Sequence, residues 1–252
     1  VNYALERKQG RSPVEGGTGT ILDHADVRRM LSEMKAEIFA ARAIALANAA
    51  AIDMASATGD AAWDARAALL TPVTKAYGTE TGIKVAQMGI QVHGGMGFIE
   101  ETGAAQYLRD VRVTAIYEGT NGIQAMDLVA RKMMDGGAEM FALLDEVDQT
   151  AKDAGAEGAR LLAASGALRE ATEKLVAMEM NDRFAGAVPY LMAVARVLGG
   201  HFHLRAALAD EARLKLARVF LNRLLPEAHS LLEQAAAGAD DLYALSAEEL
   251  SA

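Results

Sequence analysis

Residues 91–97 read Gln-Val-His-Gly-Gly-Met-Gly, and residues 116–124 read Ile-Tyr-Glu-Gly-Thr-Asn-Gly-Ile-Gln. Both stretches interrupt a sequence whose apolar residues otherwise recur at steps of three and four, the spacing of an amphipathic helix. No segment alternates with a period of two, so nothing predicts a sheet. The sequence therefore predicts an all-α protein, an up-and-down helical bundle with longer than average helices.

Working outward from the two breaks, the apolar spacing predicts eight helical segments. They cover residues 23–57, 61–92, 100–109, 122–134, 139–153, 157–180, 187–237 and 240–251. Asp23 is the expected cap of the first segment, and Pro72 is expected to kink or divide the second. Gly199-Gly200 and Pro226 are expected interruptions of the long segment. Residues 111–116 are rich in β-branched side chains and predict an extended connection.

The composition excludes several classes of protein. The chain has 252 residues, a net charge of −9 and no cysteine. Without cysteine there is no disulfide framework, thiolate zinc site or cysteine nucleophile. An acidic chain is a poor candidate for binding nucleic acid or an anionic membrane surface, because both attract clustered Lys and Arg. No run of about 18 apolar residues was found, so no membrane span is expected.

The histidines show no metal-binding pattern. His201 and His203 are two residues apart, which places them on different faces of a helix. The other three histidines are isolated, and no acidic residue has clear metal-ligand spacing relative to them. A structural role is therefore expected for each histidine, and no metal site is predicted.

The second break places a carboxylate just before a helix start. In an apolar cleft, Glu118 would suit a general base that acts near neutral pH. Gly119 leaves space for a substrate beside it. Thr120 and Asn121 are suited to cap the helix and to donate hydrogen bonds to a polar cofactor. By spacing alone, an ordinary acidic helix start explains the same residues, so both interpretations stay open.

The first break also has two interpretations. Glycines at a helix end let a ligand approach bare backbone amides and carbonyls. A simple glycine C-cap is favoured when residues 91–97 are considered alone. The run follows a predicted helix and not a strand, so it is no dinucleotide-binding turn.

Taken together, residues 91–132 strongly resemble the C-terminal helical domain of the acyl-CoA dehydrogenases. That family carries a Gln-x-x-Gly-Gly-x-Gly stretch, an Arg-Asp pair, an Ile-Tyr-Glu-Gly-Thr stretch and a helix ending in Ala-Arg. All four occur here in that order, with Arg109-Asp110 as the pair. Residues 3–10 resemble the family's Tyr-Ala-x-x-Arg segment, although the segment after Arg7 is one residue shorter. The resemblance extends from residue 1 to about residue 135.

The resemblance implies FAD-dependent oxidation of an acyl-CoA thioester to the trans-2-enoyl-CoA. In members with glutamate at this place, the carboxylate removes the α-proton while the β-hydrogen passes to the flavin as hydride. Glu118 matches that catalytic base, and Gly119 matches a substrate-binding position. The residues that match FAD-binding positions are Arg7, His24, Gln91, Val92, His93, Gly94, Gly95, Thr120, Asn121 and Gly122. Among them, Arg7 and residues 91–95 match positions that reach the flavin of a neighbouring subunit.

The same resemblance suggests a larger protein. Residues 1–135 are expected to form the dehydrogenase C-terminal domain, and residues 136–252 a helical extension like that of larger bacterial members. Members acting on methylthiopropanoyl-CoA are one candidate subgroup. Family members also have an N-terminal helical domain and a middle β-domain. We therefore expect a portion of a chain roughly twice as long, inactive and poor at binding FAD by itself.

The expected partners follow from the family as well. They are an acyl-CoA substrate, an electron-transfer flavoprotein and further copies of the chain in a dimer or tetramer, in the cytoplasm. A different class of function stays open, namely a non-catalytic helical oligomerisation module or a subunit of a heteromeric flavoprotein. Glu118 discriminates between the classes, because a scaffold has no need of a carboxylate beside Gly119.

Overall fold

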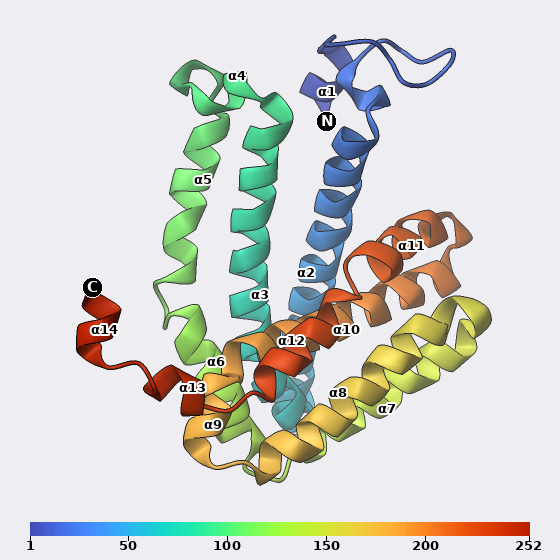
Figure 1. Cartoon of the computed structure of the whole chain (residues 1–252). Coiled ribbons are helices and arrows are strands. Elements are labelled where there is room, and N and C mark those ends of the chain that lie inside the picture. The colour runs from blue at the N-terminus through green and yellow to red at the C-terminus, as the bar shows by residue number, and fades with distance from the viewer.

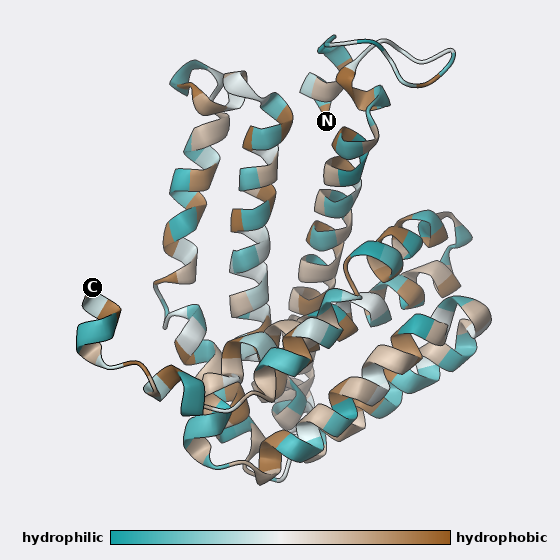
Figure 2. Cartoon of the chain, viewed as in Figure 1, coloured by the Kyte–Doolittle hydropathy of each residue, from teal (hydrophilic) through white to brown (hydrophobic).

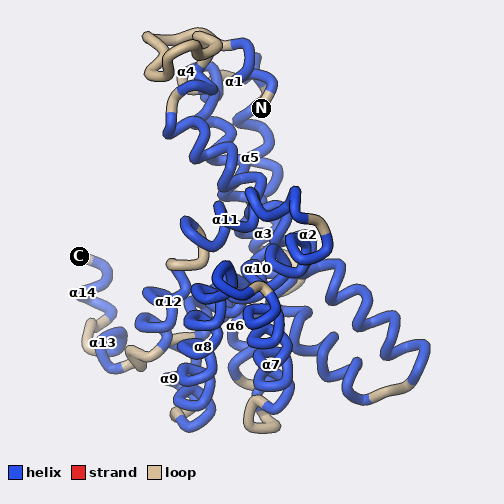
Figure 3. Tube along the Cα trace, turned by 90° about the vertical axis from the view of Figure 1, so that its right-hand side faces the viewer, coloured by secondary structure: helices blue, strands red, loops and turns tan.

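The computed structural model describes all 252 residues, and it consists of helices and connecting loops (Figure 3). The α-helices are α1 (Asn2–Glu6), α2 (Ala25–Thr58), α3 (Ala61–His93), α4 (Gly95–Phe98), α5 (Ala104–Arg112), α6 (Asn121–Val129), α7 (Ala138–Asp153), α8 (Ala159–Ala177), α9 (Met180–Ala185), α10 (Ala187–Ala209), α11 (Leu214–Arg223), α12 (Glu227–Ala235), α13 (Asp240–Tyr243) and α14 (Ala247–Ser251). Single 3-10 turns lie at Ile21–Asp23, Glu100–Thr102, Val113–Ala115, Arg131–Met133, Gly155–Gly158 and Glu211–Arg213. The prediction of an all-α fold is confirmed.

The long helices α2 and α3 form an antiparallel hairpin that spans the molecule (Figure 1). Gly59 ends α2 in the left-handed conformation, with a φ of 68°. Asp60 then caps α3, because its side chain accepts a hydrogen bond of 2.9 Å from the amide of Ala62. Helix α4 turns the chain at the far end of α3, and α5 returns along α3 toward α6 (Figure 1).

Helix α10 is the centre of the second half. It packs against α2, α3, α6, α7, α8, α11 and α12. Hydrophilic and hydrophobic residues interleave along α3, α5 and α8 (Figure 2), as expected of helices that keep one face in solvent. By contrast, α10 is buried over most of its length. A single cluster of 37 buried residues draws on both halves of the chain, so the halves share one core.

The expected break at Gly199-Gly200 is wrong, because α10 continues through both glycines. A Cβ atom at Gly199 would lie 2.3 Å from Cζ of Phe220, so glycine at this position permits close packing of α11 on α10. The chain instead breaks at Asp210, whose side chain caps the following turn at the amide of Ala212. A second break separates α11 from α12 near Pro226, where an interruption was expected.

Other expectations about local structure also need correction. Residues 111–115 are helical or in a 3-10 turn, and Ile116 follows in the right-handed region, so the stretch is not extended; no strand lies nearby to pair with it. Helix α3 runs through Pro72 without division. Helix α2 begins at Ala25 after His24, and Asp23 does not cap it. The Asp23 carboxylate instead accepts hydrogen bonds from the amide of Gly19 at 2.8 Å and from Thr18 at 3.1 Å, which ties the preceding loop together.

Helix α2 also corrects the expectation that no segment is apolar enough to span a membrane. By length and composition alone it meets that criterion, with a mean hydropathy of 1.5 over 18 residues. In the structure this helix packs against α3, α10 and α11 and carries the buried Glu37. Packing within the bundle accounts for part of its apolar character, and exposed residues such as Leu46 and Ile52 contribute the rest.

Candidate functional site

The predicted site residues form two groups at different heights along α3. The first group surrounds the end of α3 at Gly94, and the second surrounds the start of α6, beside Lys75 of α3. Gly94 is nineteen positions after Lys75 along α3, which corresponds to about 28 Å. In Figure 1 the first group lies by α1 and α4, and the second by α6.

The first group lines one open groove of about 610 Å³. Its walls include Arg7, His24 and residues 91–95, which are the complete first group. The N-terminal segment packs on the end of α3 and thereby brings these residues together. The Tyr3 hydroxyl donates a hydrogen bond of 3.2 Å to the carbonyl of His93, and the two rings lie 4.3 Å apart.

Hydrogen bonds to the backbone and to Gln9 hold the polar residues of this groove in place. The amide of Ile21 donates to the carbonyl of Arg7 at 2.8 Å, and Nε2 of His24 lies 3.1 Å from the carbonyl oxygen of Gln9. The exposed guanidinium of Arg7 has one hydrogen bond, of 3.0 Å, to the side chain of Gln9. It therefore keeps most of its donors for an anion such as a phosphate.

The glycines of the first break have different tasks. Gly94 is the C-cap of α3 at φ 62° and ψ −141°, a conformation that is essentially restricted to glycine. A Cβ atom at Gly97 would lie 2.4 Å from the carbonyl oxygen of Ile90, so this glycine is needed for close packing. Gly95 has open space where its Cβ would be and a negative φ. The C-cap interpretation is thus confirmed, and Gly95 is left free to face a ligand.

Val92 differs from the other residues in this group. Its side chain is buried in a small cluster with Ala4, Ile21 and Met30. Any contact of Val92 with a ligand must therefore come from its backbone, and its side chain packs α3 against the N-terminal segment and α2.

The second group of residues begins with two residues in the left-handed backbone conformation. Glu118 has a φ of 54° and is the only residue other than glycine with a positive φ, and Gly119 follows at 79°. The carbonyl of Glu118 accepts a hydrogen bond of 3.0 Å from the side chain of Gln124. Thr120 caps α6, since its hydroxyl accepts a hydrogen bond of 3.3 Å from the amide of Ile123, as expected.

Lys75 ties this loop to α3 and was missed by sequence reasoning. Its ammonium donates to the carbonyl of Gly119 at 2.7 Å and to Oδ1 of Asn121 at 2.8 Å. The amide of Asn121 donates in turn to Glu80 at 2.7 Å and to Thr79 at 3.0 Å. One signal was available, because Lys75 is the single basic residue between Arg66 and Lys84.

The expected apolar cleft around Glu118 is not formed by this chain. Glu118 is exposed, and the neighbouring Ile116 and Tyr117 are 53% and 54% exposed. Ile123 on the first turn of α6 is 55% exposed as well. The carboxylate and three apolar side chains close to it in sequence are therefore all open to solvent.

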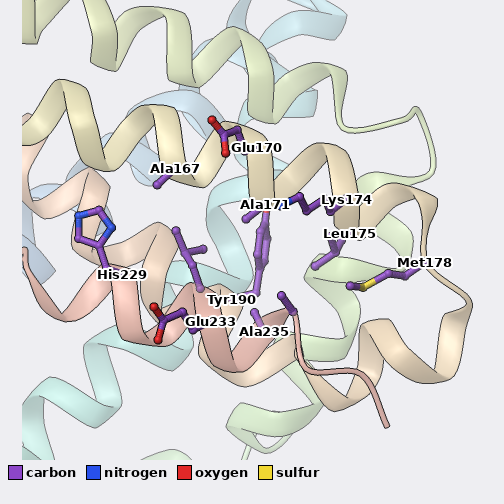
Figure 4. A pocket seen from close by; sticks show the side chains of 12 residues that line it. Ala167, Glu170, Ala171, Lys174, Leu175, Met178, Tyr190, His229, Glu233 and Ala235 are labelled. Carbon is purple, nitrogen blue, oxygen red and sulfur yellow. The ribbon is translucent and has the colours of Figure 1, made fainter. Parts of the chain in front are cut away.

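A cavity of about 250 Å³ lies elsewhere, between α8, α10 and α12. Figure 4 shows its apolar floor around Tyr190 and Leu175, with Glu170, His229 and Glu233 at the rim. No residue of either predicted group lines this cavity.

Residues 1–134 match the family described as acyl-CoA dehydrogenase, C-terminal domain. The chain belongs to the acyl-CoA dehydrogenase family. Residues 143–246 match a second description, acetyl-CoA dehydrogenase C-terminal like. The resemblance inferred from residues 91–132 is thereby confirmed.

Curated relatives support the same family. The chain is 40% identical over 231 residues to the 3-methylmercaptopropionyl-CoA dehydrogenase of Ruegeria pomeroyi, which covers 85% of this chain and 39% of the relative. It is 34% identical over 203 residues to the broad-specificity linear acyl-CoA dehydrogenase FadE5 of Mycobacterium tuberculosis, covering 77% of this chain and 32% of that protein. The chain thus spans well under half the length of both relatives.

Solved structures share the fold. Caenorhabditis elegans ACDH-11 in complex with C11-CoA has a TM-score of 0.69 at 21% identity, covering 88% of this chain and 38% of that one. An acyl-CoA dehydrogenase complexed with FAD from Bacillus anthracis has a TM-score of 0.65 at 19% identity, covering 96% of this chain and 47% of that one. The helical arrangement is therefore that of acyl-CoA dehydrogenases.

Proposed function

We propose that the chain supplies the catalytic base and part of the FAD site of an FAD-dependent acyl-CoA dehydrogenase. The observation that carries this proposal is the Glu118 loop. An exposed carboxylate stands on a left-handed backbone turn, beside Gly119 and directly before the capped start of α6. The left-handed conformation is costly for a residue with a side chain, and such conformations cluster at functional sites.

The two residue groups fit parts of a dinucleotide. In the first groove, the exposed guanidinium of Arg7 is suited to a pyrophosphate, and the open face of Gly95 permits close approach of a ligand to the backbone. At the second site, Thr120, Asn121 and Gly122 stand beside the carboxylate, where they would contact the flavin. FAD, when bound, would accept the substrate's β-hydrogen as hydride.

The chain's own residues have two proposed roles, which are to accept a proton and to contact the substrate. The carboxylate of Glu118 would accept the α-proton of an acyl-CoA thioester. Gly119 leaves room for the thioester end of the substrate, and Ile116 and Tyr117 offer apolar surface next to the base. A further protein surface would have to cover the open side and exclude water from it. Exclusion of water would strengthen every polar interaction in the site.

The separation of the two groups supports a homo-oligomer. Because about 28 Å of α3 lie between them, we propose that they contact two different flavins, each completed by a second copy of the chain. Mixing a Glu118→Gln protein with an Arg7→Ala protein tests this arrangement, since one site of each mixed dimer is intact. Activity regained on mixing supports shared sites, and no regain contradicts them.

The activity itself is tested with the complete FAD-loaded protein and a series of acyl-CoA thioesters, including 3-methylmercaptopropionyl-CoA. An electron-transfer flavoprotein is the proposed electron acceptor, and an artificial dye replaces it in the assay. The wild type is expected to form the trans-2-enoyl-CoA, and Glu118→Gln to keep its flavin while losing turnover. Turnover by Glu118→Gln at the wild-type rate would instead favour a non-catalytic helical scaffold.

A further inference from the structure

The loop that carries Glu118 has backbone geometry that its own residues do not favour. A left-handed conformation is disfavoured for a residue with a Cβ atom relative to the right-handed one. Such a conformation persists only when surrounding contacts over-determine it. The contacts that hold residues 118–121 are therefore functional candidates in their own right.

We propose that Lys75 is a positioning residue that fixes the conformation of residues 118–121 and so aims the carboxylate of Glu118. The inference rests on the proposed function, in which Glu118 is the base. Lys75 donates to the loop at two points, the carbonyl of Gly119 at 2.7 Å and Oδ1 of Asn121 at 2.8 Å. Gly119 is the residue directly after Glu118, and Asn121 is three residues after it, at the start of α6.

Lysine suits this task because its ammonium offers three donors at the end of a flexible stem. Each bond is charge-assisted and hence stronger than a bond between neutral groups. Lys75 projects from the middle of α3, which packs against α2, α5, α6 and α10. A long helix buried in this way is a rigid support for the loop.

Asn121 extends the attachment to two further residues of α3. The side-chain amide of Asn121 donates to Glu80 and Thr79. One side chain is therefore hydrogen-bonded to three residues of α3, namely Lys75, Thr79 and Glu80. Asn121 is the first residue of α6. The same contacts therefore fix both the start of α6 and the turn that precedes it.

The ammonium of Lys75 bonds to the loop and forms no ion pair with Glu118. The carboxylate thus stays available to accept a proton, while its position is set through the backbone. A base displaced by about 1 Å loses on the order of 100-fold in rate. Loss of Lys75 is therefore expected to lower catalysis more than it lowers stability.

The loop conformation can be tested without substrate or flavin. Hydrogen exchange of the 252-residue chain is compared for wild type, Lys75→Met and Lys152→Met, the last being an exposed lysine on α7 that serves as control. Lys75→Met is expected to speed exchange of the amides at 123–126, the first hydrogen-bonded amides of α6, by about tenfold or more, with α8 and α10 unchanged. Unchanged exchange at 123–126 overturns the proposal.

A second variant guards against a folding defect. Asn121→Ala removes the acceptor from the loop side and leaves Lys75 in place. It is expected to speed exchange of the same amides, and equal protection in this variant and the wild type would count against the proposal.

Kinetics of the complete FAD-loaded protein separate positioning from a merely structural role. Lys75→Met is expected to lower kcat about 10- to 100-fold with KM changed less than about twofold, and Lys75→Arg to recover part of kcat. A fall in thermal stability with kcat unchanged overturns the proposal. If the wild type oxidises no acyl-CoA, the proposed function fails, while the exchange measurement still decides whether Lys75 orders the loop.

Discussion

Arg196 of α10 and Glu37 of α2 form a buried ion pair, in which Nη1 of Arg196 lies 2.7 Å from Oε2 of Glu37. Their side chains are 3% and 1% exposed. Tyr77 donates to the same carboxylate at 2.5 Å, and Lys84 donates to its other oxygen at 2.9 Å. The pair joins the part of the chain that matches the dehydrogenase domain to the part that matches the second family description.

The electrostatics of this pair are consistent with its contacts. Burial alone would raise the pKa of the Glu37 carboxyl, but the charge of Arg196 and hydrogen bonds from Arg196, Tyr77 and Lys84 outweigh it and lower the pKa. Burial and the negative charge of Glu37 raise the pKa of the Tyr77 hydroxyl, which keeps it protonated as a donor. The carboxylate is therefore charged and fully paired at neutral pH.

Breaking this pair is expected to be costly. Arg196→Met leaves Glu37 buried without its main partner, and such a change typically costs 3–5 kcal/mol of unfolding free energy. Glu37→Gln should cost less, because Arg196 keeps its ion pair with Glu227 at 2.7 Å, and the double variant should lose less than the sum of the two. Urea unfolding of the four proteins gives the coupling between the residues.

The matched control is Arg218→Met. Arg218 pairs with Glu157 at the surface, where the two side chains are 54% and 35% exposed. Its removal should leave the urea midpoint nearly unchanged. If Arg196→Met unfolds at the same urea concentration as this control, the pair does not couple the two halves of the chain.

Acid sensitivity is expected from two buried histidines. Burial lowers the pKa of His201 and of His203 to about 4, and the charge of Arg205 adds to the effect at His201. Each is neutral in the folded chain, and Nε2 of His203 donates to the carbonyl of Ala36 at 3.1 Å. The unfolded chain binds protons below about pH 6.5, so each imidazole should lower stability by about 2 kcal/mol at pH 5.

The pH window separates this effect from that of Glu37. Stability from a carboxylate with a lowered pKa is lost only as pH falls below about 4.5, whereas loss from the histidines begins near pH 6.5. Unfolding free energies measured from pH 7.5 to 5 should fall in the wild type. In His201→Leu/His203→Gln the same pH series should be nearly flat, and an equally steep fall there would exclude these histidines as the cause.

Two glycines close to the end of α3 are expected to differ in how an alanine substitution changes stability. Gly97→Ala would place a Cβ atom 2.4 Å from a backbone carbonyl, and overpacking of this kind typically costs 1–3 kcal/mol. Gly95→Ala meets open space at a negative φ, so it should be neutral or stabilising by about 0.5 kcal/mol. Thermal unfolding of the two variants checks the expectation. Equal melting temperatures would contradict the packing assigned to Gly97.

Much of the fold could be predicted because helices depend on local spacing. The two helices of the α2–α3 hairpin follow from apolar periodicity, and the structure adds Gly59 as the end of α2 and Asp60 as the cap of α3. The course of α10 could not be predicted in this way. From the sequence alone, Gly199 predicts a break in the helix. In the structure, its lack of a side chain leaves space for Phe220 of α11. That contact is tertiary and leaves no local signal.

In the candidate site as well, contacts between residues close in sequence could be predicted, and contacts between distant residues could not. The cap at Thr120 was predictable because its partner is three residues away. The grouping of Arg7 with residues 91–95 came only from family resemblance, since it depends on packing of Tyr3 against His93 across 90 residues. Lys75 was missed because its partner is a backbone carbonyl 44 residues along the chain.

The central claim is that Glu118 removes a proton from an acyl-CoA, and flavin reduction in a single anaerobic turnover tests it most directly. The complete FAD-loaded protein is mixed with acyl-CoA as wild type, as Glu118→Gln and as Glu173→Gln, an exposed glutamate on α8 that serves as control. We expect Glu118→Gln to reduce its flavin about 10²- to 10⁴-fold more slowly, with α-deuterated substrate slowing the wild type and the control alike. Flavin reduction at the wild-type rate in Glu118→Gln, with the same α-deuterium effect, would contradict the claim.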